Sequence, residues 1–105
     1  MLVSALIRRV QAAGGFAAVL HRGDAMAGAI LIDCLNRGQA ELRIERGTDA
    51  RGDDGWRIVD TAETIADEAA SDRLERRIKN DPDLWVIELD IAEAERFAAE
   101  TIASA

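Results

Sequence analysis

The residues of this chain that could do chemistry are few and scattered. The only histidine stands in the stretch HRGD at residues 21–24, and the only cysteine, Cys34, lies in the apolar stretch AILIDCLN. A zinc site needs three or four protein ligands, which one histidine and one cysteine do not supply. The three serines, at positions 4, 71 and 104, stand outside any GxSxG sequence. The sequence therefore predicts no catalytic residue, no metal site and no cofactor.

Three ionisable side chains interrupt apolar stretches. Cys34 is predicted to be a buried, inert thiol, because apolar surroundings disfavour the reactive thiolate. Asp33 and Glu88 each break a largely apolar strand, and a buried carboxylate must find a partner. With twelve arginines in the chain, an ion pair or a position facing a sheet edge is favoured over a catalytic role for both.

The stretch HRGD has the composition of a turn. Arg-Gly-Asp occurs again at residues 51–53, inside the polar stretch GTDARGDDG. Glycine and aspartate favour tight turns, because glycine adopts unusual backbone angles and aspartate bonds to nearby backbone groups. We interpret residues 22–24 as a turn between two strands and not as a site.

Length and composition indicate one globular domain over residues 1–105. Apolar residues make up 49% of the chain and charged residues 31%, which is typical of folded proteins. No stretch approaches the ~20 apolar residues of a membrane span, so no membrane association is predicted. A single cysteine excludes an internal disulfide, which favours a reducing compartment, the cytoplasm.

The net charge of −7 is unevenly distributed. Residues 1–46 carry six arginines and four acidic residues, a balance of +2, whereas residues 47–105 carry seven basic and sixteen acidic residues, a balance of −9. An acidic chain repels the phosphate backbone that supplies most non-specific affinity for nucleic acids. Nucleic acid is therefore excluded as a partner.

Hydrophobic periodicity predicts the elements that would position these residues. Apolar residues at spacings of three and four predict a helix over residues 2–13, which Gly14 and Gly15 end. Strands are predicted at residues 16–21, 26–35, 40–46 and 56–59. A helix starting near residues 60–64 ends before Pro82, and LWVIEL at residues 84–89 is a strand that is apolar on both faces. Residues 91–105 favour a short third helix.

This order predicts an α+β fold with two layers: a mainly antiparallel five-stranded sheet with two or three helices on one face. Short turns between consecutive strands favour a meander, with the last strand antiparallel to the first. The predicted strand order is 4-3-2-1-5. In the strictly alternating stretch 40–46, Leu42 and Ile44 are expected to face inward, and Glu41, Arg43 and Glu45 to face water.

The stretch NDPDLWVIE, residues 80–88, carries a family resemblance. Together with ALIRRVQAAGGFAAVLHRGD at residues 5–24 and AGAILI at residues 27–32, it resembles a family of small, mostly alphaproteobacterial proteins known as domain of unknown function 1491. The resemblance covers most of residues 5–90. It implies a cytoplasmic bacterial domain and brings no activity, cofactor or catalytic residue.

Two functional classes remain open. One is a non-enzymatic interaction or dimerisation module that uses a sheet edge or face, with an unknown protein partner or a second copy. The other is a ligand binder or enzyme with a pocket between helix and sheet, for which Trp85, Arg22, Asp81 and Asp83 are the candidate binding residues. The poor supply of nucleophiles and bases favours the first class.

A homodimer is the expected assembly. Several strands are apolar on both sides, so a two-layer fold would leave one apolar sheet face open, and such faces mark interfaces. Ala17, Leu31, Leu84 and Val86 are the expected members of that face, with Val86 as its test position. Trp85, by alternation, is expected in the core.

Overall fold

The computed structural model of the protein describes residues 2–26, 28–48 and 51–104. The elements follow in the order α1 (Leu2–Ala12), β1 (Phe16–His21), β2 (Ile30–Asn36), β3 (Gln39–Thr48), β4 (Asp54–Thr61), α2 (Ala62–Ile65), α3 (Glu68–Asn80), β5 (Trp85–Asp90) and α4 (Ala94–Ser104). The strands form one sheet in which only β2 and β5 are parallel neighbours. The predicted α+β fold with a mainly antiparallel five-stranded sheet is confirmed, with four helices among the described residues in place of two or three.

The strand order differs from the meander expected from the sequence. The observed order is β1-β5-β2-β3-β4, so β5 lies between β1 and β2, and β1 forms an edge. The predicted order 4-3-2-1-5 is wrong in this one insertion, although β5 is antiparallel to β1 as expected. The central position suits a strand that is apolar on both faces, because each face of β5 then meets a packed layer.

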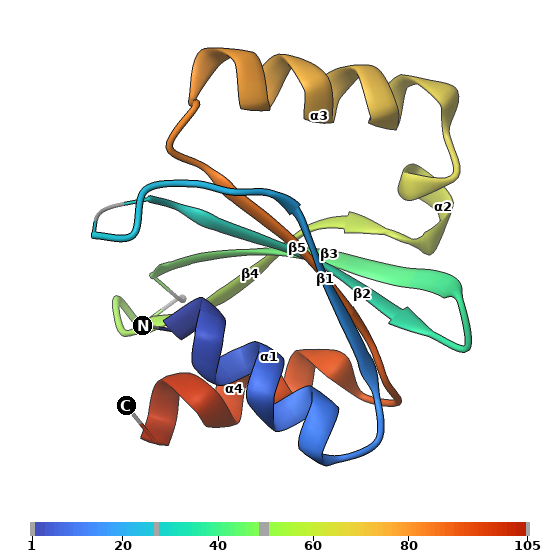
Figure 1. The fold of residues 1–105 in the computed structure, drawn as a ribbon. Coiled ribbons are helices and arrows are strands. Elements are labelled where there is room, and N and C mark those ends of the chain that lie inside the picture. The colour runs from blue at the N-terminus through green and yellow to red at the C-terminus, as the bar shows by residue number, and fades with distance from the viewer. Residues whose placement is uncertain (1, 27, 49–50, 105) are drawn as a thin grey trace.

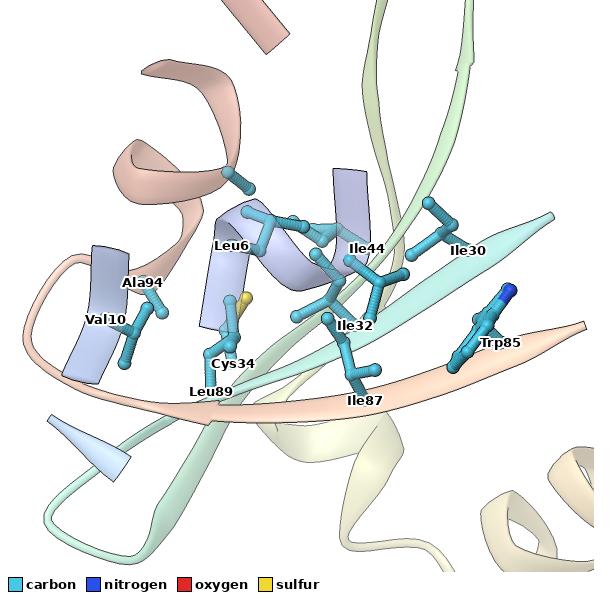
Figure 2. Packing of buried hydrophobic residues seen from close by; sticks show 12 residues of the cluster. Leu6, Val10, Ile30, Ile32, Cys34, Ile44, Trp85, Ile87, Leu89 and Ala94 are labelled. Atoms are coloured by element: carbon cyan, nitrogen blue, oxygen red, sulfur yellow. The ribbon is translucent and has the colours of Figure 1, made fainter. Parts of the chain in front are cut away.

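One face of the sheet carries the main core, beneath α1 and α4 (Figure 1). Leu6 and Val10 of α1 and Ala98 of α4 are fully buried against it. Figure 2 shows the side chains of Ile32 and Ile87 gathered with those of Leu6 and Val10 between the helices and the sheet. Trp85 belongs to the same cluster and is 5% exposed, so the prediction that it is a core residue is confirmed.

The opposite face is covered by α3 (Figure 1), so the protein has helices on both faces and three layers instead of two. Leu31, Leu84 and Val86 form a second, smaller buried cluster there, against which Leu74 and Ile78 of α3 pack. The apolar sheet face that was expected to be open is therefore closed within one chain. Val86 has no exposed surface, and a charge placed there would disrupt the fold before it affected any assembly.

The helix expected between residues 60–64 and residue 80 is two helices. The N–H of Thr61 donates to the hydroxyl of Thr64 at 2.8 Å at the start of α2. Asp67 then caps α3 by accepting a hydrogen bond from the N–H of Ala69 at 3.1 Å. A capping aspartate satisfies an otherwise unpaired helix N–H, so Asp67 favours a new helix start at this point.

Candidate functional site

Two of the stretches that carry the family resemblance, residues 5–24 and 80–88, meet in space. The segment between β1 and β2 passes over the start of β5, where the N–H of Asp24 donates to the carbonyl of Asp83 at 3.0 Å. The indole N–H of Trp85 donates to the carbonyl of Asp24 at 2.7 Å, and Nδ1 of His21 lies 2.7 Å from the carbonyl of Leu84. HRGD is thus not a hairpin turn, because β5 separates the two strands that it connects.

Glycine is required where these two segments touch. A Cβ atom on Gly23 would lie 2.1 Å from the carbonyl oxygen of Asp83, and one on Gly28 would lie 2.2 Å from the same atom. Both distances are far inside van der Waals contact, so any side chain would push the backbones apart. The junction is a backbone clamp that fixes the start of β5.

The five residues expected to bind or form an interface do not make one open surface. Trp85 and Val86 are buried, on opposite faces of β5. Asp81 is half-buried at the end of α3, where its N–H donates to the carbonyl of Arg77. Arg22 and Asp83 are exposed beside the junction.

The edge strand β1 presents three large apolar side chains to solvent. Phe16 is 76% exposed, Val19 45% and Leu20 51%. No residue from 16 to 20 is charged, whereas the other edge, β4, carries Asp54, Arg57 and Asp60 within the strand. Edge strands are usually protected from pairing with other chains by such charges or by proline.

A buried ion pair lies on the sheet face beneath α3. Nε and Nη2 of Arg43 donate to the two carboxylate oxygens of Asp33 at 2.6 and 3.2 Å, and both side chains are largely buried. Burial lowers the pKa of Arg43, but the hydrogen bonds and charge of Asp33 outweigh it, together with those of Asp60, so the pKa lies above its ordinary value. The expected ion pair of Asp33 is confirmed.

The ion pairs extend from the sheet to α3. Nη2 of Arg73 donates to Asp60 at 3.1 Å, and Nη1 of Arg43 lies 3.6 Å from the same carboxylate. Glu45 accepts hydrogen bonds from Arg77 of α3 and, at 3.2 Å, from Arg57 of β4. Four guanidinium groups therefore share three carboxylates.

Sequence reasoning missed this cluster. Leu42 and Ile44 face the main core as expected, but Arg43 and Glu45, expected in water, are only 7% and 8% exposed because α3 covers their face. The sequence held one signal for the cluster: Arg73 and Arg77 are four residues apart, so they lie on the same face of α3. The prediction that Glu88 forms an ion pair or faces a sheet edge is wrong. Glu88 lies on the interior strand β5, and within the described ranges it forms no ion pair.

Cys34 is 1% exposed and lies among core side chains (Figure 2). Burial, with smaller contributions from the charges of Glu95, Asp33 and Glu41, raises its pKa to about 12. The prediction of a buried, inert thiol is confirmed.

We expect the Cys34 thiol of the folded protein to react with Ellman's reagent about a thousandfold more slowly at pH 8 than a free thiol, because a pKa raised from 9 to about 12 removes almost all thiolate. Stability from the neutral thiol is fully present below pH 9 and is lost as the pH rises toward 12. Unfolding in guanidinium should restore the ordinary rate. Rapid labelling of the folded protein would contradict this expectation.

Within residues 2–26, 28–48 and 51–104, no three His, Cys, Asp or Glu side chains are grouped so as to hold a metal ion. In the same part of the chain, no helix has both the length and the apolar character needed to cross a membrane.

The fold defines a small α+β protein with one five-stranded sheet between two helical layers and an ion-paired cluster under one of them. The chain belongs to the family described as "Protein of unknown function (DUF1491)", whose model matches residues 1–99. The resemblance found in the sequence is thereby confirmed. No curated protein matches the chain.

Solved structures of family members have the same fold. A crystal structure of a DUF1491 family protein from Caulobacter crescentus CB15 is 31% identical, with a TM-score of 0.73 over 90% of this chain and 88% of that one. The solution structure of protein Atu0922 from A. tumefaciens is 35% identical, with a TM-score of 0.65 over 89% and 84% of the two chains. An NMR structure of a Caulobacter crescentus family protein is 34% identical, with a TM-score of 0.67 over 91% and 86%.

Proposed function

We propose that this protein is a non-enzymatic interaction module that forms a homodimer through the edge strand β1. The observation that carries the proposal is the uncharged edge: β1 has an unpaired side in the sheet, no charged residue from 16 to 20, and three large apolar side chains between 45% and 76% exposed. Its register with β5 shifts only near its end, between Val19 and His21, so residues 16–19 form a regular strand. Such an edge is a template for pairing with another strand.

A second copy is the partner that this edge fits. Two antiparallel β1 strands related by a two-fold axis pair the same surface with itself, as in most soluble dimers. Each chain carries a net charge of −7, but the uncharged stretch from 16 to 20 brings no like charges together. Joined edge to edge, the two five-stranded sheets would form one continuous sheet, in which the exposed apolar side chains of β1 would contact those of the partner strand.

The cytoplasm is the proposed location. The chain has one cysteine, and Cys34 is buried without a disulfide partner. Proteins of oxidising compartments more often use cysteine in pairs, so this usage supports a reducing compartment.

We expect Val19→Lys to convert a dimer to a monomer, because a lysine on an edge strand opposes pairing and its charge would be desolvated at the interface. Sedimentation equilibrium on the order of 100 µM should give about 23 kDa for the unmodified protein, twice the 11.4 kDa of the chain, and about 11 kDa for the variant.

The matched control is Ile58→Lys, at a position that is 63% exposed on the opposite edge strand β4. It should leave the dimer intact, and circular dichroism should show both variants folded. An 11.4 kDa monomer for the unmodified protein, or equal dissociation by the two variants, would overturn the proposal.

A further inference from the structure

The ion-paired cluster borders an open pocket that the proposed dimer does not use. Between α3 and the sheet lies a pocket of about 290 Å³, lined by Leu31, Arg43, Val59, Asp60, Arg73, Leu74 and Arg77. Its volume is near the lower limit of small-molecule sites, which span about 300–1,000 Å³. Three of its seven lining residues are arginines and one is acidic.

The arginines of this pocket have hydrogen-bonding capacity left over. Among the described residues, Arg73 and Arg77 each donate to carboxylates through Nη2, whereas a guanidinium group offers five N–H donors on three nitrogens. Their side chains are 43% and 39% exposed, so the remaining donors are accessible. Arg43 adds a third, buried guanidinium at the pocket wall.

The charge of the cluster favours an anion. Four guanidinium groups, of Arg43, Arg57, Arg73 and Arg77, are paired with three carboxylates, which leaves one positive charge in the cluster. Arg57, the fourth of them, pairs with Glu45 and is not among the residues that line the pocket. That charge lies in a protein whose net charge is −7. Guanidinium groups bind tetrahedral oxyanions through several N–H donors at once.

We propose that this pocket binds the phosphoryl group of a small organic phosphate. Arg73 and Arg77 would bind the phosphoryl oxygens from α3, and Arg43 would bind them from β3. Leu31, Val59 and Leu74 line the remaining wall and would contact the organic part of the ligand. The pocket lies over β2, β3 and β4, whereas β1 forms the opposite edge of the sheet. Phosphate binding therefore does not depend on dimer formation.

The test is a titration of the intact protein with inorganic phosphate and with phenyl phosphate, followed by ¹⁵N chemical shifts at constant ionic strength. We expect saturable shifts around β3, β4 and α3, and tighter binding of phenyl phosphate than of inorganic phosphate. Arg73→Gln and Arg77→Gln should each weaken binding at least tenfold. Acetate at the same ionic strength should bind more weakly than phosphate.

Arg76→Gln is the matched control, because Arg76 lies on the same helix but lines a different surface hollow, with Asp72, Glu75 and Lys79. It should bind phosphate with unchanged affinity. The proposal is overturned by non-saturable shifts, by equal weakening in all three variants, or by acetate binding as tightly as phosphate. The pocket lies within one chain, so a monomer and a dimer would both contain it. Sedimentation equilibrium on the same samples therefore tests the dimer separately from phosphate binding.

Discussion

Replacing Trp85 with alanine should lower the free energy of unfolding by about 3–5 kcal/mol, the usual cost of deleting a buried large aromatic side chain. Trp85 is 5% exposed and lies in the main core. Its indole N–H also holds the segment between β1 and β2 through the carbonyl of Asp24. The loss would therefore affect both the core and the backbone clamp at the start of β5.

Guanidinium unfolding measures this effect, and two variants separate its causes. Trp85→Phe keeps most of the apolar surface but loses the hydrogen bond to Asp24, so it should cost less than Trp85→Ala, by an amount that reflects packing. Ile58→Ala is the apolar control at a position 63% exposed on β4, away from the β1 edge, and it should change stability by about 0.5 kcal/mol or less. An unchanged midpoint for Trp85→Ala would show that this residue does not support the core.

Arg43→Leu should also cost about 3–5 kcal/mol, because it removes one partner from a buried ion pair and leaves the carboxylate of Asp33 without its two hydrogen bonds. The remaining charge of Asp33 is desolvated beneath α3, where its side chain is 13% exposed. Asp60 keeps Arg73 as a partner, so the damage is centred on Asp33.

The double variant Asp33→Leu/Arg43→Leu should be more stable than Arg43→Leu alone, because it removes the unpaired charge and adds apolar contacts. Arg46→Leu is the control on the same strand: Arg46 pairs with Asp54 at 2.9 Å, with side chains 42% and 50% exposed. A pair so open to water contributes little, so this variant should stay near the unmodified protein. Equal losses for Arg43→Leu and Arg46→Leu in urea unfolding would contradict the buried role of Arg43.

Much of the local structure could be predicted from the sequence. The spacing of Leu6 and Val10 predicted α1, and the bounds of β1 agree with the expected strand at residues 16–21. The apolar surroundings of Cys34 predicted its burial, and the need of Asp33 for a partner predicted its ion pair. These inferences depend on neighbours along the chain, whose periodicity and polarity act over a few residues.

The interruption between α2 and α3 was missed although its cause is local. Asp67 can cap a helix, but the apolar spacing on both sides of it is compatible with one continuous helix. The choice depends on whether the N–H of Ala69 gains more from the aspartate side chain than from a helical carbonyl. Periodicity alone does not decide between these two hydrogen-bonding patterns.

Short motifs and local periodicity were sufficient to predict the family, the α+β class and most helices and strands. The strand order became clear only from the tertiary structure, in which β5 lies between β1 and β2. No turn places β5 there; the interior position buries both of its apolar faces. That insertion left β1 as a free edge. The placement of α3 over the second face then buried Arg43 and Glu45, which an alternating pattern assigns to water. Alternation along a strand tells which residues share a face, but only the packing of distant elements determines whether that face meets solvent or protein.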